Sequence, residues 1–470
     1  MTRTPETSTT RAGGAGARRG ATTLAPVLAL TLFLLALQVG RDLEPGAPGN
    51  PGGSVAPAPA GSPVPTGEDD VASSTGWQQV LPGLALAFPR DHGAHPRTRT
   101  EWWYLTGQVV AEDGRRFGLQ VTVFRRGLGD GPLAVDAASP LLVEGAAELP
   151  ASPLRSGQVL LGHLALTDVA TGRTRFAERL RRPGAGLARA SEADLDVRLE
   201  DWTIAREDLA PAAGAGVLQA LAADGVALPV TADAPAFAPT ERVLVRASDS
   251  AAGFGLTLEL VPAKPLVGHG DAGYSAKGGA TGNASAYTSW TRLATRGTLT
   301  LDGEELAVAG ASWFDHEFGS SVLAEGVTGW DWFGLHLDDG RELMAFDLRT
   351  AAGGRHAASA GTLVAPDGTP RSLTAAAFTI TPRGTWTSPH TGGVYPAGWT
   401  LALPDEDLVL VALPLVADCE LVTDGSTGVA YWEGPVELFA PGPDGEPTGP
   451  AVGRGYAELT GYAGAMTGRL

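Results

Sequence analysis

The stretch TEWWYLTGQVVAEDGRRFGLQVTVFRR, residues 100–126, decides the fold class of this sequence. Apolar and polar residues alternate on both sides of an Asp-Gly pair, and aromatic and β-branched residues predominate. Alternation with a period of two is typical of β-strands, and an Asp-Gly pair between two such runs is typical of a hairpin turn. The stretch therefore predicts a β-hairpin whose first strand carries two tryptophans and a tyrosine behind one acid, Glu101.

Short alternating runs of this kind recur from residue 77 almost to the C-terminus. Examples are GFGLTLELVP, RGTLTLDGEELAVAGASWFD, LVLVALPLV and GVAYWEGPVELFA. Helical periodicity is scarce, because the one short candidate, PAAGAGVLQALAADG, is interrupted by glycines. The sequence thus predicts an all-β protein, and the spacing of the runs leaves a sandwich and a barrel equally open.

Two segments of the chain resemble each other. Residues 101–126 and residues 329–349 both show an aromatic strand, an Asp-Gly-Arg turn and an apolar strand that ends in arginine. This weak internal repeat predicts two similar β units. We place the boundary after residue 300, which gives an N-terminal β domain of residues 76–300 and a C-terminal β domain of residues 301–470.

The composition is that of an acidic, folded body. Of the 470 residues, 43% are hydrophobic and 18% are charged, close to the average of globular proteins. The formal net charge of −18 excludes nucleic acid and anionic lipid surfaces as main partners, since both require a basic footprint. The single cysteine, Cys419, excludes an intramolecular disulfide.

The N-terminal segment combines a basic stretch with an apolar run. Two arginines, residues 18–19, precede the uncharged run of residues 24–40, which predicts a signal anchor or signal peptide over residues 1–41. We favour an uncleaved anchor, because Arg41 follows at once and no small-x-small cleavage site is present. The arginines place the body outside the cytoplasm, at the cell membrane or, after cleavage, secreted. Residues 42–75, rich in Pro, Gly and Ala, predict a disordered linker.

The first group of polar and aromatic residues lies in FPRDHGAHPRTRTEWWY, residues 88–104. Because strand side chains alternate between faces, Glu101 shares a face with Trp103, and Trp102 shares the other with Tyr104. A carboxylate among tryptophans is costly to bury without a partner. Glu101 is therefore either an ion-paired residue at the mouth of a barrel or a polar group of a cavity.

The loop before this strand offers partners for Glu101. Arg97 and Arg99 are the expected ion-pair partners, and the loop around His95 is the expected polar environment. His92 and His95 do not predict a metal site, because the Pro-flanked loop supplies no further obvious ligand. We expect neither a metal nor a cofactor.

The second group is GASWFDHEFGSS, residues 310–321. In a strand, Asp315 and Glu317 share one face with Trp313, and His316 lies on the other face. Two neighbouring carboxylates in an aromatic environment push their pKa values apart, so that one can stay protonated while the other is charged. Such a pair suits acid-catalysed addition or removal of water, although a structural network that anchors a strand to a loop gives the same pattern.

The third group is GWDWFGLHLDDGRELMAF, residues 329–346. Trp330 and Trp332 share one face and Asp331 takes the other. Exposed tryptophan faces suit a flat apolar or cationic group, including a carbocation-like transition state, while plain core aromatics fit equally well. The second and third groups are close in sequence, so we expect adjacent strands whose acids converge and one acid with a raised pKa.

These motifs, together with GYSAKGGATGNASAYTSWTRLATRGTL, TWTSPHTGGVYPAGW and YWEGPVEL…GRGYAELTGY, resemble the AttH-type secreted hydrolases. That family is related to the carotenoid 1,2-hydratases, or hydroxyneurosporene synthases, and the resemblance spans residues 76–462. It implies two lipocalin-like β-barrels packed together, with ligand sites in or between them. It also implies enzymes acting on isoprenoid or polyketide substrates, and genes often found beside those of ABC exporters.

The family's motifs fall on identifiable positions of this chain. By resemblance, the matching residues are Glu101, Trp102, Tyr104, Asp315, His316, Glu317, Trp330, Asp331, Trp332, Tyr431, Trp432 and Glu433. Two departures are present. The stretch of residues 211–243 is longer than expected, and SWFDHEFG is closer to the AttH-type form than to the hydratase form.

We therefore expect an extracytoplasmic hydrolase or hydratase that acts on a lipophilic small molecule. The predicted catalytic residues are Asp315, Glu317, Asp331, Glu101 and His316. The predicted substrate-binding residues are Trp102, Tyr104, Trp313, Trp330, Trp332, Tyr431, Trp432 and His95.

The main alternative is a non-catalytic carrier that passes a hydrophobic ligand to or from a membrane exporter, and glycoside hydrolysis is a weaker one. A cavity in which every acid forms a salt bridge would favour the carrier, whereas acids of the cavity without a cationic partner would favour the enzyme.

Overall fold

The computed structural model describes residues 76–129, 157–210, 237–320 and 326–464, with a few single positions between these ranges. The predicted anchor of residues 1–41 and the linker of residues 42–75 lie outside the described residues, as does most of the longer stretch after residue 210. Among the described residues, no helix has the length and apolar character needed to cross a membrane.

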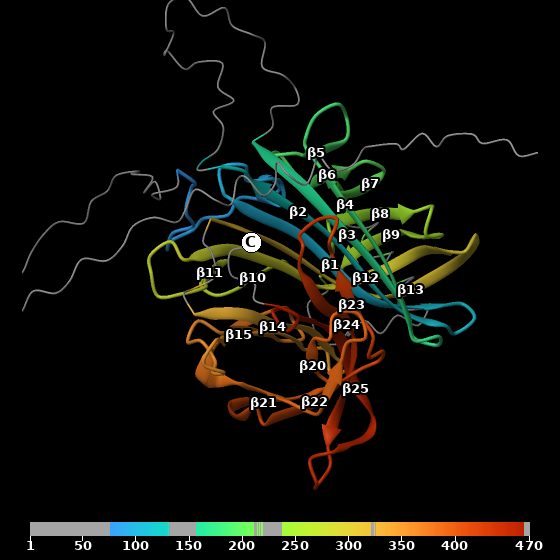
Figure 1. Ribbon diagram of the computed structural model, residues 1–470, viewed down its shortest axis with the longest axis vertical. Coiled ribbons are helices and arrows are strands. Elements are labelled where there is room, and N and C mark those ends of the chain that lie inside the picture. Colours follow the sequence, from blue (N-terminus) through green and yellow to red (C-terminus); the bar gives the residue numbers. More distant parts are fainter. Residues whose placement is uncertain are drawn as a thin grey trace, which may run out of the picture. The chain divides into compact units, whose positions relative to one another are not determined.

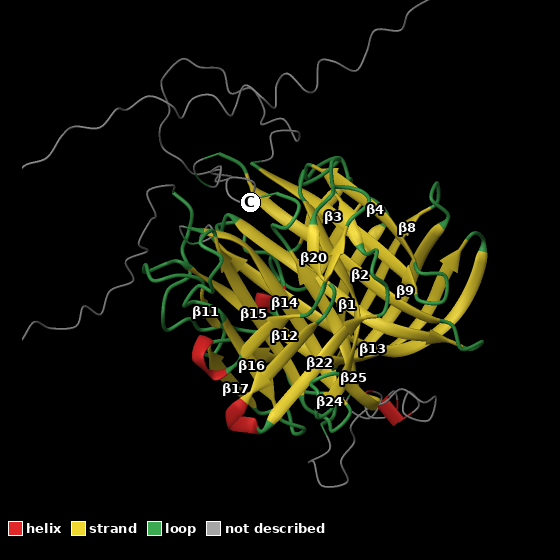
Figure 2. Cartoon of the chain, turned by 60° about the horizontal axis from the view of Figure 1, so that its bottom comes forward, coloured by secondary structure: helices red, strands yellow, loops and turns green. Residues whose placement is uncertain are grey.

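The described chain is almost entirely β-structure (Figure 2), which confirms the predicted fold class. It forms two large antiparallel sheets and a two-stranded ribbon, β19 (Thr385–Thr387) with β20 (Val394–Pro396). The named helical elements are three short 3-10 turns, η2 (Arg90–His92), η3 (Ala375–Ala377) and η4 (Pro404–Glu406).

The first sheet has the order β4-β3-β2-β1-β13-β12-β9-β8-β7-β6-β5, and β10 and β11 pair with β12 (Figure 1). Its strands are β1 (Thr100–Ala111), β2 (Arg116–Gly127), β3 (Gln158–Asp168), β4 (Arg173–Arg181), β5 (Ala188–Ala190), β6 (Asp196–Leu199), β7 (Trp202–Asp208), β8 (Glu241–Asp249), β9 (Phe254–Pro262), β10 (Val267–Gly268), β11 (Tyr274–Ala276), β12 (Ala284–Leu301) and β13 (Glu304–Gly319).

The first sheet curls until its two edges approach each other. Arg179 of β4 reaches the strands at the other end of the sheet, where its guanidinium donates to the carbonyl oxygen of Ser248 in β8 at 2.9 Å. Gly162 of β3 lies so close to β6 and β7 that a Cβ there would meet Leu199 and Trp202 within 3 Å. The sheet thus forms a nearly closed, lipocalin-like barrel around an apolar core that includes Trp103 and Trp290.

The second sheet has the order β17-β16-β15-β14-β25-β24-β22-β21-β18, with β23 pairing with β24. Its strands are β14 (Val327–Leu337), β15 (Glu342–Thr350), β16 (Ala360–Val364), β17 (Pro370–Thr374), β18 (Thr379–Pro382), β21 (Trp399–Leu403), β22 (Leu408–Pro414), β23 (Glu420–Val422), β24 (Ala430–Pro441) and β25 (Pro447–Leu459). It encloses its own core, to which Phe333, Trp399 and Trp432 belong.

The change of sheet falls later in the chain than the sequence predicts. The expected boundary after residue 300 is the end of β12, which pairs with β13 along its whole length, so both strands belong to the first sheet. The chain enters the second sheet only at Val327. Period-two alternation is the same on both sides of such a hairpin, so it marks strands but not sheets.

The predicted repeat is visible in the two matching hairpins, β1–β2 and β14–β15. In the first, Asp113 accepts hydrogen bonds from the backbone N–H and Nε of Arg115, at 3.0 and 2.6 Å. In the second, Asp339 accepts from the same two groups of Arg341, at 3.0 and 2.9 Å. Both turns end on a glycine with positive φ, a conformation that glycine adopts without strain.

A third apolar cluster lies between the sheets and joins them. It contains Tyr104 and Trp313 from the first sheet and Trp332 and Tyr456 from the second. Gln108 of β1 adds polar contacts, since its Nε2 donates to the carbonyl oxygens of the second sheet at residues 436 and 455. The outer face of β1 and β13 is therefore an internal surface, and this surface holds the candidate site.

Candidate functional site

The register between β1 and β13 determines which side chains meet. Trp102 is opposite Glu317, Tyr104 is opposite Asp315, and Trp103 is opposite His316. Alternation then puts Trp102, Tyr104 and both acids on the face toward the second sheet, as the sequence predicts. Glu101, Trp103 and His316 lie on the inner face of the first barrel.

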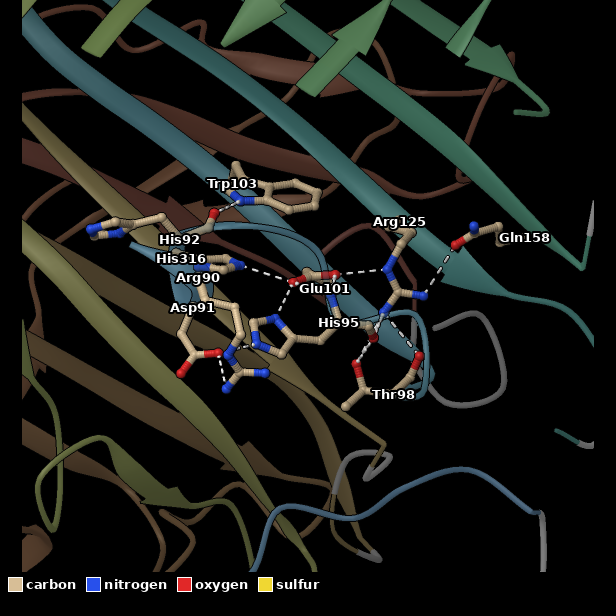
Figure 3. A network of polar contacts seen from close by, with 10 residues as sticks. All are labelled: Arg90, Asp91, His92, His95, Thr98, Glu101, Trp103, Arg125, Gln158 and His316. Atoms are coloured by element: carbon tan, nitrogen blue, oxygen red, sulfur yellow. Dashed lines mark hydrogen bonds and ion pairs between the residues drawn. The ribbon is translucent and has the colours of Figure 1, made fainter. Parts of the chain in front are cut away.

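The inner face carries a polar network around the fully buried Glu101 (Figure 3). Its carboxylate accepts hydrogen bonds from Arg125 Nε at 2.7 Å and from the His95 backbone N–H at 2.9 Å, and His95 Nδ1 and His316 Nε2 both lie 2.9 Å away. Burial raises the pKa of a carboxyl group, but these hydrogen bonds and the Arg125 charge outweigh it and hold the pKa of Glu101 below its usual range.

This network ties the loop before β1 to the barrel. Arg125 Nη2 donates to the carbonyl oxygens of His95 and Thr98, at 2.7 and 2.9 Å, and His95 Nε2 lies 3.1 Å from Asp91 Oδ1. The predicted pairing of Glu101 with Arg97 or Arg99 is wrong, because the cross-strand neighbour Arg125 takes that role.

The network also bears on the predicted metal and catalytic residues. Ligand atoms of His95, Glu101 and His316 lie within 4.8 Å of one another, close enough to surround a cation. In the structure, however, both histidine rings point at Glu101 within hydrogen-bond distance, and Arg125 already balances its charge. This geometry suits a network that holds the loop in place better than a metal centre.

Asp315 is the acid of the face between the sheets, and its side chain has only neutral donors. It accepts hydrogen bonds from the Ser289 hydroxyl, from Tyr287 OH at 2.8 Å and from Trp313 Nε1 at 2.5 Å. Burial raises its pKa to about 7, because these three donors compensate only part of the lost hydration. Asp315 therefore exchanges a proton near neutral pH.

His269 stands behind Asp315 and orients its donors. Its Nε2 lies 2.7 Å from Ser289 Oγ, and its Nδ1 lies 2.8 Å from Thr362 Oγ1 of the second sheet. Burial lowers its pKa to about 3, so the ring is neutral and carries one N–H. Since the Ser289 proton goes to Asp315, His269 must donate from Nε2 and accept from Thr362.

Aromatic side chains from both sheets surround Asp315. The ring of Trp332 meets those of Tyr104 and Trp313 edge to face, with centroids 5.3 and 6.1 Å apart. Trp332 Nε1 also donates to Tyr287 OH at 3.0 Å, which places the second sheet in contact with the Asp315 network. Trp102 and Trp330 are partly exposed at the rim of this region.

The second sheet contributes two acids of its own, Glu433 and Glu458, which are cross-strand neighbours in β24 and β25. Tyr104 OH donates to Glu433 Oε1 at 2.5 Å, and Trp330 Nε1 donates to Glu458 at 2.9 Å. Burial raises the pKa of both, to about 7 for Glu458, and the Glu458 charge raises the pKa of Glu433 further. One proton is therefore kept on this pair near neutral pH.

With this geometry in view, the chain can be compared with known proteins. A family model described as AttH-like matches residues 79–462. The chain belongs to the AttH-like family. The predicted resemblance is thereby confirmed. No curated protein matches the sequence.

Two solved structures are similar to this AttH-like protein. An AttH protein of Nitrosomonas europaea is 32% identical, with a TM-score of 0.63 over 82% of this chain and 99% of its own. Kievitone hydratase of Nectria haematococca is 13% identical, with a TM-score of 0.54 over 83% of this chain and 97% of its own. The second likeness shows the shared fold alone.

Two of the predicted catalytic acids of the AttH-like chain are neutralised by cations. Glu317 accepts from Ser285 and lies 2.9 Å from Lys277 Nζ, at the edge of the Asp315 region. Asp331 lies 2.9 Å from Arg349 Nε on the other face of β14, and burial raises its pKa to about 6.

The predicted convergence of Asp331 with Asp315 and Glu317 is wrong. β13 and β14 belong to different sheets, and Asp331 accepts hydrogen bonds from Tyr462 OH on the side away from Trp330 and Trp332. Proximity in sequence misled the prediction, because the chain crosses between sheets in the seven residues that separate the strands.

Two further predicted residues of the AttH-like chain lie apart from Asp315. Tyr431 OH lies 2.8 Å from Nδ1 of the buried His163, at the contact of β24 with β3. Trp432 points into the core of the second sheet and donates to the carbonyl oxygen of Ala417 at 2.7 Å. Trp432 therefore does not line the face between the sheets.

The structure thus gathers part of the predicted site and adds to it. The residues at the face between the sheets are Trp102, Tyr104, Trp313, Asp315, Glu317, Trp330 and Trp332. Sequence reasoning missed Tyr287, Ser289, His269 and Glu458 as members of the site. Three of these had a signal, because Tyr287 and Ser289 lie in the family motif GYSAKGGATGNASAYTSWTRLATRGTL and Glu458 lies in GRGYAELTGY. Alternation puts Tyr287 and Ser289 on one face, and Glu458 on the face of Tyr456.

Proposed function

We propose that this AttH-like protein is a hydratase or hydrolase that acts on a lipophilic small molecule, isoprenoid- or polyketide-like, between its two sheets. The observation that carries the proposal is Asp315. It is a buried carboxyl group with a pKa raised to about 7, hydrogen-bonded only to neutral donors and surrounded by aromatic rings. A group of this kind can donate a proton at neutral pH.

The reaction would use the acids of both sheets. Protonated Asp315 gives its proton to a double-bond carbon or to a leaving oxygen. The electron-rich faces of Trp332 and Tyr104 stabilise the positive charge that develops. The ionised member of the Glu433–Glu458 pair accepts a proton from the attacking water, so that the elements of one water are added to the substrate.

The carrier alternative is less well supported. A carrier needs an apolar cavity, and acids there would be expected in ion pairs. Glu101, Glu317 and Asp331 are paired in this way, but Asp315 and Glu433 have no cationic partner among the described residues. Unpaired buried acids cost stability, which is reasonable where they perform chemistry.

The place of action is also proposed from the sequence. Arginines before an apolar run, and an acidic body behind it, support a position outside the cytoplasmic membrane. A lipophilic substrate in or near the membrane, and a neighbouring exporter, would fit that position.

Ligands that copurify with the protein test the proposed function. The wild type and the variants Asp315→Asn and Asp302→Asn are expressed in parallel, and bound small molecules are identified by mass spectrometry. Asp302 is exposed and serves as the control. We expect Asp315→Asn to retain a substrate that differs by one water, or by a hydrolysed group, from the ligand of the other two proteins. Identical ligands in all three proteins would support the carrier.

A further inference from the structure

A groove of about 950 Å³ lies along one edge of the contact between the two sheets. Its floor comes from the first sheet, including Val110, Leu244 and Ala309, and its end wall comes from His336 and Arg454 of the second sheet. Val110 is 40% exposed, so part of this floor is an open apolar surface. The groove can thus hold the apolar part of a small molecule.

The groove continues into a narrow neck that leads toward the candidate site. The neck has a volume of about 10 Å³, the size of one water or one ligand oxygen. It shares Gln108, His336 and Arg454 with the groove and reaches Trp313 and Tyr456. Trp313 donates its indole N–H to Asp315 at 2.5 Å, so the neck ends one side chain away from the proposed acid.

Two polar side chains at the neck are available to a ligand. The Thr106 hydroxyl has no hydrogen-bond partner among the described residues although Thr106 is only 1% exposed. Arg454 is half-buried and lines both cavities, and none of the hydrogen bonds and ion pairs of the described residues involves its guanidinium. A buried hydroxyl without a partner, such as that of Thr106, is uncommon and requires an explanation.

The other charged residues of the groove leave Arg454 as the available cation. Arg116, Arg292 and Arg296 are paired with glutamates at 2.6, 2.5 and 2.7 Å. The acids Glu112 and Asp338 are exposed, so water screens their charge.

We infer that the groove and neck form a subsite for the carboxylate of an amphiphilic substrate. Arg454 binds the carboxylate with two N–H groups, the Thr106 hydroxyl donates to it, and the apolar chain lies against Val110 and its neighbours. Planar guanidinium and carboxylate groups match in this bidentate manner. The inference rests on the proposed function, because it places one end of the substrate beside the Asp315 region.

Binding of two matched probes tests the inference. Farnesoic acid and farnesol have the same isoprenoid chain and differ in carrying a carboxylate or a hydroxyl group. Titration of the full-length protein, followed by calorimetry, gives the dissociation constant of each. We expect the acid to bind at least about tenfold more tightly than the alcohol, because a charge-assisted pair is stronger than a neutral hydrogen bond.

The variant Arg454→Met keeps an unbranched apolar side chain and removes the charge. We expect it to bind the acid and the alcohol within about twofold of each other, while the matched control Arg189→Met, at an exposed ion pair on β5, keeps the wild-type preference. Thr106→Val should weaken binding of the acid and leave binding of the alcohol unchanged.

Three results would overturn the inference: no binding of the acid, equal binding of both probes by the wild type, or a preference that survives Arg454→Met. None of them bears on Asp315, whose role is decided by the retained ligands of Asp315→Asn. Failure of the subsite and failure of the proposed function are therefore distinguishable.

Discussion

At the residue scale, two buried acids on neighbouring strands show how donors decide the state of a carboxyl group. Glu101 and Asp315 are both almost inaccessible to solvent, yet the pKa of the first is lowered and that of the second is raised. Glu101 has hydrogen bonds from His316 and His95 and the charge of Arg125 to hold its pKa down, whereas Tyr287 and the other donors to Asp315 are neutral and fewer interactions offset its burial. Only Asp315 is suited to exchange protons.

The raised pKa of Asp315 predicts a specific pH dependence of stability. The pKa of Asp315 is raised from its ordinary value of 3.8 to about 7. At pH values between these two, Asp315 of the folded protein holds a proton that the unfolded chain has lost. Stability therefore falls as the pH rises through this window, by roughly 4 kcal/mol if the whole shift is realised. Asp315→Asn cannot titrate, so denaturant melts of both proteins from pH 4 to 8 should show the wild type losing stability relative to the variant. A constant difference would contradict the raised pKa.

His269 is predicted to be a positioning residue. His269→Phe removes the N–H that directs the Ser289 hydroxyl toward Asp315, so the charged form of Asp315 loses a donor and its pKa rises further. His269→Gln restores an N–H near the position of Nε2 and should return the pKa toward the wild-type value. Carboxyl carbon NMR of Asp315 measures this directly, and a purely structural role would not distinguish the two variants.

At the scale of elements, alternation and turn residues could be predicted from the sequence, and strand pairing could not. The faces of β1, β13 and β14 and the two Asp-Gly turns follow from local pattern alone. By contrast, β13 pairs with β1 across nearly 200 residues, and no local rule indicates this. For the same reason the sequence does not predict the Glu433–Glu458 pair, which depends on the register between β24 and β25.

A buried ion cluster connects β12 to the β14–β15 hairpin of the other sheet. Glu342 is fully buried and binds Lys264 Nζ at 2.7 Å and Arg292 Nε at 2.5 Å. Glu342→Gln leaves two buried cations without a countercharge, so we expect a loss of about 3–5 kcal/mol in the free energy of unfolding. Glu304→Gln, at an exposed pair with Arg115, should leave the free energy of unfolding nearly unchanged in the same denaturant melts, because water screens this pair.

At the scale of the whole molecule, the contact between the two sheets is what makes a site. Asp315 belongs to the first sheet, but its environment depends on Trp332 and Thr362 from the second, and Glu433 of the second sheet takes its donor, Tyr104, from the first. Neither sheet alone would contain the proposed acid and base together. Substitutions that separate the sheets should therefore affect chemistry before they affect either core.

The extent of the strands and of the buried core along the sequence predicts how much of the chain the fold requires. All named strands lie between Thr100 and Leu459, and Trp77 is the most N-terminal large side chain in the described core, 1% exposed with its Nε1 3.2 Å from the Gly129 carbonyl oxygen. A chain shortened to begin at residue 76 should thus unfold at nearly the same denaturant concentration as the full-length protein.

A chain that begins at residue 80 loses Trp77 and is the matched comparison. Removing a fully buried tryptophan typically costs about 3–5 kcal/mol, because the space against Gly127 is left unfilled. Chemical denaturation of the three proteins, followed by tryptophan fluorescence, measures both effects. If the chain that begins at residue 76 were as unstable as the one that begins at residue 80, residues before 76 would contribute to the fold, and the assignment of residues 42–75 as a linker would be wrong.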